Sequence, residues 1–120
     1  MQGKYNFGHQ YFGPWVMVNI EGNMPYEVSK CIELKGYIDN LIDNSNKNLA
    51  INLISLDSCG SQLVNILISE VKKIKGSGRD MAIISKENID TEVLELTGIY
   101  KLVKRYKSIE QFRLKTPETR

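Results

Sequence analysis

A short polar segment, Asp57-Ser58-Cys59-Gly60-Ser61, holds the residues best suited to chemistry in this chain of 120 residues. It follows a short apolar run and precedes an amphipathic stretch, so we expect it at the N-terminus of a helix. Backbone N–H groups are unpaired there and the helix dipole favours negative charge, which suits a phosphate group. Ordinary capping explains the same residues, because Asp and Ser are preferred N-caps and Gly permits a tight turn. Both interpretations are open at this point.

Other candidates for chemistry have simpler explanations. His9 has no serine or cysteine nucleophile at a recognisable spacing, so it is interpreted as a surface histidine. The run Gly76-Ser77-Gly78 follows a helical pattern and lacks the Lys-Ser/Thr ending of a phosphate loop, which indicates a helix stop. Asp39 and Asp43 share one helix face at a spacing of four residues, and we expect them to keep that face solvated.

Cys31 and Cys59 are the only cysteines, and neither belongs to a Cys-x-x-Cys pair. With His9 as the single histidine they cannot form a zinc site, and we expect both thiols to stay reduced. A helix N-terminus can activate a thiol, so a redox sensor acting through Cys59 is one alternative function. No Lys, Arg or His lies near Cys59 in the sequence, which favours an inert small residue in place of a serine.

Composition and length exclude several classes of protein. The 16 Lys and Arg residues nearly balance the 14 Asp and Glu residues, so the net charge of +2 does not indicate binding to nucleic acid or to an anionic membrane. No stretch approaches the ~18 consecutive apolar residues of a transmembrane helix. The first eleven residues lack the apolar core of a secretion signal. We expect one domain in the cytoplasm.

The spacing of apolar residues predicts the elements that position the polar segment. Residues 4–11 and 15–21 read as strands and flank Gly13-Pro14, which predicts an N-terminal hairpin. Apolar stripes at intervals of three and four residues predict helices over 25–43 and 61–75.

Short apolar runs predict buried strands over 49–53 and 81–84, and a loop is expected over 55–60. Three further patterns predict a helix, the start of an edge strand and a final helical turn, over 88–97, 102–103 and 109–112. Strands that alternate with helices predict an α/β layer structure with largely parallel pairing after the hairpin.

Three segments together resemble the STAS domain of bacterial anti-sigma factor antagonists. The strand 49–53 followed by Asp57-Ser58-Cys59-Gly60 is similar to the family's Asp-Ser-Ser-Gly loop at the start of a helix. Val93-Leu94-Glu95-Leu96-Thr97-Gly98-Ile99-Tyr100-Lys101-Leu102 resembles the segment after the family's fourth strand. Tyr106-Lys107-Ser108-Ile109-Glu110-Gln111-Phe112 resembles its closing segment. The resemblance covers roughly residues 15–112.

The resemblance implies a STAS-like α/β fold, in which helices pack on one face of a mixed four- to five-stranded sheet. It implies a single STAS domain over 1–120, with a core at about 15–112 and a frayed tail at 113–120. The implied protein is a binding module without enzymatic activity or cofactor. Its implied partner is an anti-sigma factor, typically a small ATP-binding serine kinase, and docking would free the sigma factor.

The partner would contact the polar segment and the exposed edge of the helix that follows it. Ile66 supports this surface, because it lies about 100° from Leu67 on a helical wheel and away from the buried arc. A half-buried position at the rim of the core explains Ile66 equally well. The predicted partner-binding residues are Asp57, Ser58, Cys59, Gly60, Ser61, Gln62 and Ile66.

Cys59 stands where phosphorylation-controlled members of the family carry the acceptor serine, and Ser58 matches the serine before it. Because a thiol is not the acceptor of a Ser/Thr kinase, we expect no standard phosphoserine switch. A substitute acceptor at Ser58 or Ser61 is left open. Two other family motifs differ in this chain. Ser61-Gln62 stands where the family has Leu-Gly, and Gly22-Asn23-Met24-Pro25 stands where it has Gly-x-Leu-Asp. An alternative function is a STAS scaffold or regulatory subunit of another signalling or lipid-transport complex.

Overall fold

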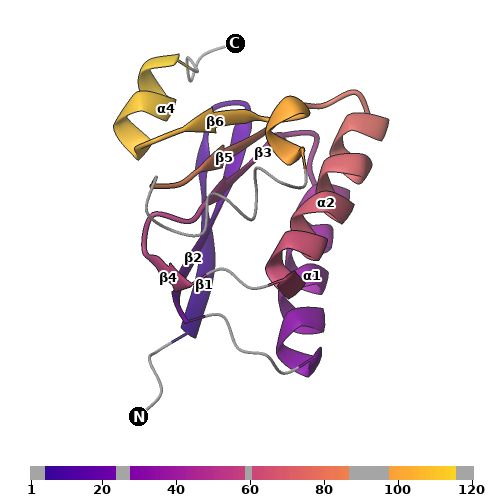
Figure 1. The fold of residues 1–120 in the computed structure, drawn as a ribbon. Coiled ribbons are helices and arrows are strands. Elements are labelled where there is room, and N and C mark those ends of the chain that lie inside the picture. The colour runs from indigo at the N-terminus through magenta and orange to yellow at the C-terminus, as the bar shows by residue number, and fades with distance from the viewer. Residues whose placement is uncertain (1–4, 24–27, 59–60, 87–97, 116–120) are drawn as a thin grey trace.

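The fold is built around a twisted sheet. The structure is a computed structural model, and it describes residues 5–23, 28–58, 61–86 and 98–115. The strand order of the sheet is β1-β2-β3-β5-β6, and β4 pairs with the far end of β2 (Figure 1). β1 and β2 form an antiparallel hairpin, whereas the other pairs are parallel, as predicted. The strands are β1 (Tyr5–Phe12), β2 (Trp15–Asn23), β3 (Asn48–Asn52), β4 (Leu56–Ser58), β5 (Met81–Ile84) and β6 (Lys104–Tyr106).

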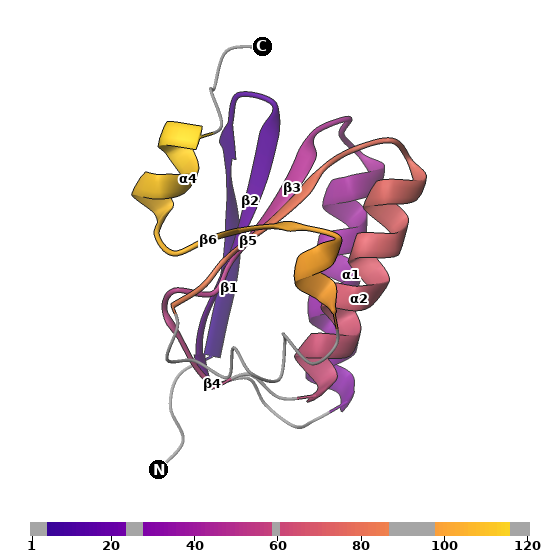
Figure 2. The same ribbon diagram turned by 45° about the horizontal axis from the view of Figure 1, so that its top comes forward.

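Helices cover the sheet from both sides. α1 (Val28–Asp43) and α2 (Ser61–Gly76) lie side by side on one face. The short helix α4 (Ile109–Lys115) lies on the opposite face, as Figure 2 shows. A 3-10 turn, η1 (Ile99–Lys101), precedes β6. The predicted packing of helices on one face is therefore confirmed for α1 and α2, and α4 adds a cover to the other face.

The alternation of side chains along β2 explains the two layers. Val16, Val18 and Ile20 belong to the larger core, which also contains the buried faces of α1 and α2. Trp15 and Met17 point to the other face and belong to a smaller core beneath α4. Because successive residues of a strand point to opposite faces, the stretch 15–18 of β2, which is buried on both sides, is continuously apolar.

A capping pair starts α4, whose buried side chain is directed to the sheet. The Gln111 backbone N–H donates to Ser108 Oγ at 3.0 Å. In return, the Lys107 backbone N–H donates to Gln111 Oε1 at 2.7 Å. Phe112 is 1% exposed. Its ring meets those of Trp15 and Tyr106 nearly edge-on, at centroid distances of 5.2 and 5.4 Å.

Arg79, just before β5, fastens the loop that leads from α1 to β3. Its Nη1 donates to the carbonyl oxygens of Ile42, Ser45 and Lys47 at 3.1, 2.8 and 3.2 Å. Its Nε donates to Ser77 Oγ at 2.8 Å. One side chain therefore binds a carbonyl in the last turn of α1, which the helix itself leaves unpaired, and two carbonyls of the loop that follows.

Three details differ from the predicted elements. The expected loop over 55–60 contains β4, because the end of β2 offers a free edge that residues 56–58 can join. The last strand spans 104–106 and does not start at 102–103 as expected. Gly98 adopts φ 74° and begins the 3-10 turn at 99–101, so the chain becomes extended only after that turn. α4 continues to Lys115, three residues beyond the expected core boundary. The helix predicted over 88–97 lies outside the described residues.

We expect Phe112→Ala to lower the free energy of unfolding by about 3–5 kcal/mol, because it removes a large, fully buried ring from the smaller core. Leu114→Ala is the matched control on the same helix. Leu114 is 78% exposed, so its truncation is expected to change stability by less than about 0.5 kcal/mol. Urea denaturation measures both. Equal effects of the two substitutions would contradict the placement of α4.

Candidate partner-binding site

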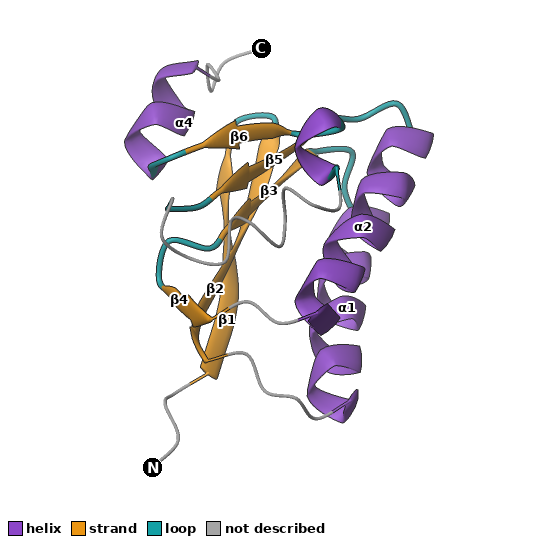
Figure 3. Cartoon of the chain, viewed as in Figure 1, coloured by secondary structure: helices purple, strands orange, loops and turns teal. Residues whose placement is uncertain are grey.

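The predicted polar segment spans the end of β4 and the start of α2. β4 pairs in parallel with the end of β2, with Gly22 opposite Leu56 and Asn23 opposite Ser58, and the register shifts between these two pairs. Figure 3 shows β4 as a short strand at this end of the sheet. α2 begins at Ser61, so the predicted position at a helix start is confirmed. Cys59 and Gly60 lie outside the described residues.

A hydrogen-bonded pair of asparagines, one of them buried, fixes the route from β3 to β4. Asn52, at the end of β3, is 8% exposed and its Nδ2 donates to Asn19 Oδ1 at 2.7 Å. Its Oδ1 accepts the backbone N–H of Ile54 at 3.1 Å. Leu53 N–H then donates to the Ile84 carbonyl at 2.8 Å. The turn that carries the chain toward Asp57 is thus held by both side-chain and backbone bonds.

Ile66 is a predicted contact residue that the structure removes from the surface. Its side chain is 6% exposed and belongs to the larger core. The prediction that it lies on the exposed edge of the helix is therefore wrong. Gln62 is half-buried, and Asn65 is exposed in the next turn. Asn65 was not among the predicted contact residues, although its spacing of three from Gln62 places the two on one helix face.

The burial of Ile66 follows from the two neighbours of α2. The sheet covers the side that carries Leu63 and Leu67. α1 covers an adjacent side, which carries Glu70, because Glu70 contacts Lys35 of α1. Ile66 lies one turn before Glu70 and shares that side. A helix packed against two surfaces buries a wider arc than a helix packed against one.

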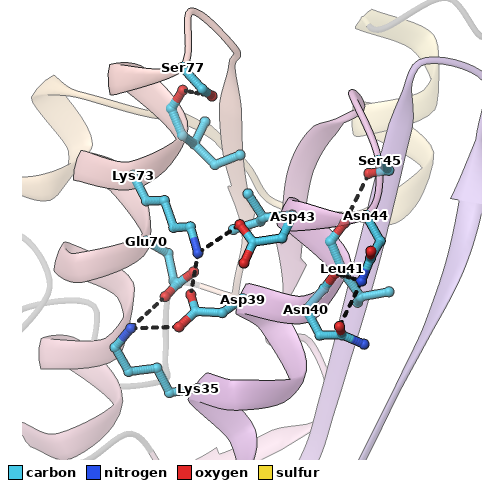
Figure 4. A network of polar contacts seen from close by, with 12 residues as sticks. Lys35, Asp39, Asn40, Leu41, Asp43, Asn44, Ser45, Glu70, Lys73 and Ser77 are labelled. Carbon is cyan, nitrogen blue, oxygen red and sulfur yellow. Dashed lines mark hydrogen bonds and ion pairs between the residues drawn. The ribbon is translucent and has the colours of Figure 1, made fainter.

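A network of charges joins α1 to α2 on this second side (Figure 4). Lys35 Nζ lies 2.9 Å from Asp39 Oδ2 and 3.3 Å from Glu70 Oε1. Lys73 Nζ lies 3.0 Å from Asp43 Oδ1 and 3.5 Å from Asp39 Oδ1. Glu70 is fully buried. The expectation that Asp39 and Asp43 only solvate a helix face is wrong, because both are ion-paired with Lys73 of α2 and Asp39 is also half-buried.

Opposing effects act on the carboxyl groups of this network. Burial raises the pKa of Glu70 to about 7, and the hydrogen bond and negative charge of Asp39 add to the effect, whereas Lys35 opposes it. Burial alone would raise the pKa of Asp39. Hydrogen bonds with Glu70 and Lys35 and the positive charges of Lys35 and Lys73 outweigh it, so the pKa of Asp39 is lowered. Asp39 is therefore the group that stays ionised.

The remaining candidates occupy ordinary positions. His9 is exposed and its Nδ1 is hydrogen-bonded to the Tyr37 hydroxyl. The predicted helix stop is confirmed, since α2 ends at Gly76 and Gly78 adopts φ 78°. Cys31 is buried, and burial raises the pKa of its thiol.

The described residues contain no group of three or more His, Cys, Asp or Glu side chains suited to a metal ion. None of the described helices is long and apolar enough to cross a bilayer.

We expect Ile66→Ala to lower the free energy of unfolding by about 2–5 kcal/mol, the usual cost of truncating a buried isoleucine. Asn65→Ala, at the exposed neighbouring position, is expected to change it by less than about 0.5 kcal/mol. Thermal or urea denaturation of the two variants checks this difference. A fully stable Ile66→Ala protein would show that Ile66 lies at the surface.

Comparisons with known proteins agree on the fold. No family model and no curated protein matches the sequence. Among solved structures, an anti-sigma factor antagonist from Mycobacterium paratuberculosis is similar, with a TM-score of 0.77, 17% identity and 89% coverage of each chain. A putative anti-sigma factor antagonist from Thermotoga maritima has a TM-score of 0.74 and 22% identity, over 91% of this chain and 92% of that one. A variant of RsbS from Moorella thermoacetica has a TM-score of 0.70 and 14% identity, over 88% and 89%.

Proposed function

We propose that this chain, which has the STAS-like fold of anti-sigma factor antagonists, is itself an anti-sigma factor antagonist that acts by binding a protein partner. The observation that carries the proposal is the shared fold over about nine-tenths of the chain, combined with a polar segment at the junction of β4 and α2. The compared structures are regulators, which favours binding over catalysis. The proposed setting is the cytoplasm.

The proposed docking surface consists of the β4–α2 junction and the exposed face of the first turns of α2. It retains six of the predicted residues, and Asn65 takes the place of Ile66 because Asn65 is exposed and Ile66 is buried. The residues of this surface are polar or small, as in the rim of many protein–protein interfaces. Its residues are Asp57, Ser58, Cys59, Gly60, Ser61, Gln62 and Asn65.

The proposed partner is an anti-sigma factor of the serine-kinase-like ATPase type. Phosphoryl transfer needs an oxygen nucleophile in line with the γ-phosphate of the nucleotide, and Cys59 supplies a thiol at the position of the family's acceptor. Ser58 belongs to β4 and Ser61 to α2, so neither occupies the acceptor position between them. We infer that binding is constitutive or is controlled at another position.

The docking surface is tested by adding bulk and charge at Asn65. We expect Asn65→Arg to weaken binding to the cognate anti-sigma factor by about tenfold or more, because it places a large side chain in the interface. Asn46→Arg is the matched control. Asn46 is exposed in the loop between α1 and β3, and Arg79 ties that loop to the other end of α2. Isothermal titration calorimetry with each purified candidate partner measures both. Unchanged affinity of the Asn65→Arg protein would place the interface elsewhere.

Position 59 is tested by restoring the hydroxyl. With the cognate kinase and ATP, we expect no phosphate on the wild-type protein and one phosphate on Cys59→Ser, measured by intact mass. Cys59→Asp is expected to weaken partner binding, because it adds a negative charge beside Asp57. Phosphopeptide mass spectrometry on protein from its native cell completes the test. Stoichiometric phosphate on Ser58 or Ser61 that abolishes binding would show that the switch has moved and survived.

A further inference from the structure

Glu70 occupies a position that a permanently charged carboxylate does not fill well. Its side chain has no solvent exposure, and its Oε1 contacts Lys35 Nζ at 3.3 Å. Its second oxygen, Oε2, is buried without a hydrogen-bond partner. Oδ1 of Asp39, across the helix contact, is also buried without a hydrogen bond, and its ion pair with Lys73 spans 3.5 Å. Buried oxygens without a hydrogen bond are costly, because each lone pair has lost its water.

The groups around Glu70 do not balance its charge. The described network contains two lysines, Lys35 and Lys73, and three carboxylates, Asp39, Asp43 and Glu70, so full ionisation leaves one excess negative charge. The sheet offers no compensation, because the strand side chains in the core shared with α2 are apolar. They include Val18, Leu49, Ile51, Met81 and Ile83. One proton added to the network makes it neutral.

We propose that Glu70 and Asp39 together form a site for a single proton that joins α1 to α2 and that is emptied at alkaline pH. A proton on Glu70 turns its carboxyl group into a donor, which can satisfy the facing carboxylate of Asp39. The pKa of Glu70 is raised to about 7, first by burial and then by Asp39, while the pKa of Asp39 is lowered, so the shared proton resides on Glu70. Loss of this proton leaves two facing carboxylates between the helices.

The site makes stability depend on pH in a defined direction. The pKa of Glu70 is about 7 in the folded protein, against an ordinary value of 4.5. Between these values the folded state binds more protons than the unfolded state, so stability falls as the pH rises. The contribution of Glu70 is complete below pH 4.5 and is lost above pH 7. This proton site is independent of the partner proposed above, because it lies within the chain.

The test compares wild type with Glu70→Gln, which keeps the shape of the side chain and cannot ionise. The unfolding equilibrium constant of wild type, divided by that of the variant, is expected to rise roughly 100-fold between pH 4.5 and pH 8. Titrating groups that do not contact Glu70 are common to both proteins and cancel in this ratio. Glu33→Gln, at an exposed position on α1, is the matched control, and its ratio is expected to change less than about threefold. A constant ratio for Glu70→Gln, or one that falls with pH, would overturn the proposal.

A direct titration keeps the proposal decidable if the Glu70→Gln protein fails to fold. The carboxyl carbon of Glu70 in the folded wild-type protein is followed by NMR, and its assignment rests on the main-chain resonances of α2. A midpoint near pH 7 is expected. A midpoint below pH 5 would show that Glu70 is a charged group in an ordinary ion pair and would reject the shared proton.

Discussion

Burial of both faces of the sheet is the constraint on which the rest of this fold depends. β2, β3 and β5 contribute side chains to two separate cores, so each face needs its own cover. Parallel neighbours also require crossover connections, and successive crossovers of one handedness that move in one direction along the sheet place their helices on one face. α1 and α2 obey this rule, and the short helix α4 closes the face that they leave open.

The same geometry decides where polar residues collect. β4 pairs with the end of β2 and is followed by α2. The segment around Asp57 and Ser61 therefore lies at the end of the sheet and not at its centre. Inside, only particular pairings make polar groups acceptable. Asn52 meets Asn19 across neighbouring strands and fixes their register. Glu70 meets Lys35 and Asp39 across neighbouring helices and fixes how α1 and α2 face each other.

The strands and helices were predictable from sequence wherever local periodicity decided the outcome. Residues 81–84 form the predicted strand and the helix predicted over 61–75 extends by one residue, because continuous and three-to-four-residue apolar patterns are local signals. β4 was not predictable, since three residues form a strand only when a partner edge is present. The orientation of Ile66 and the network around Glu70 were missed because both depend on a second helix packed beside α2. The position of the polar segment at a helix start was predictable, because caps and turns are also local.

The bonds made by Arg79 determine how this protein can be engineered. Surface loops usually accept insertions at a small entropic cost. The connection between α1 and β3 is different, because Arg79 binds the carbonyls of Ile42, Ser45 and Lys47, and the Asn48 N–H donates to the Pro14 carbonyl at 2.8 Å. An inserted tag or a new chain terminus there would separate three distant parts of the chain at once. We therefore expect circular permutation or domain insertion in this short connection to destabilise the fold, although the connection lies at the surface.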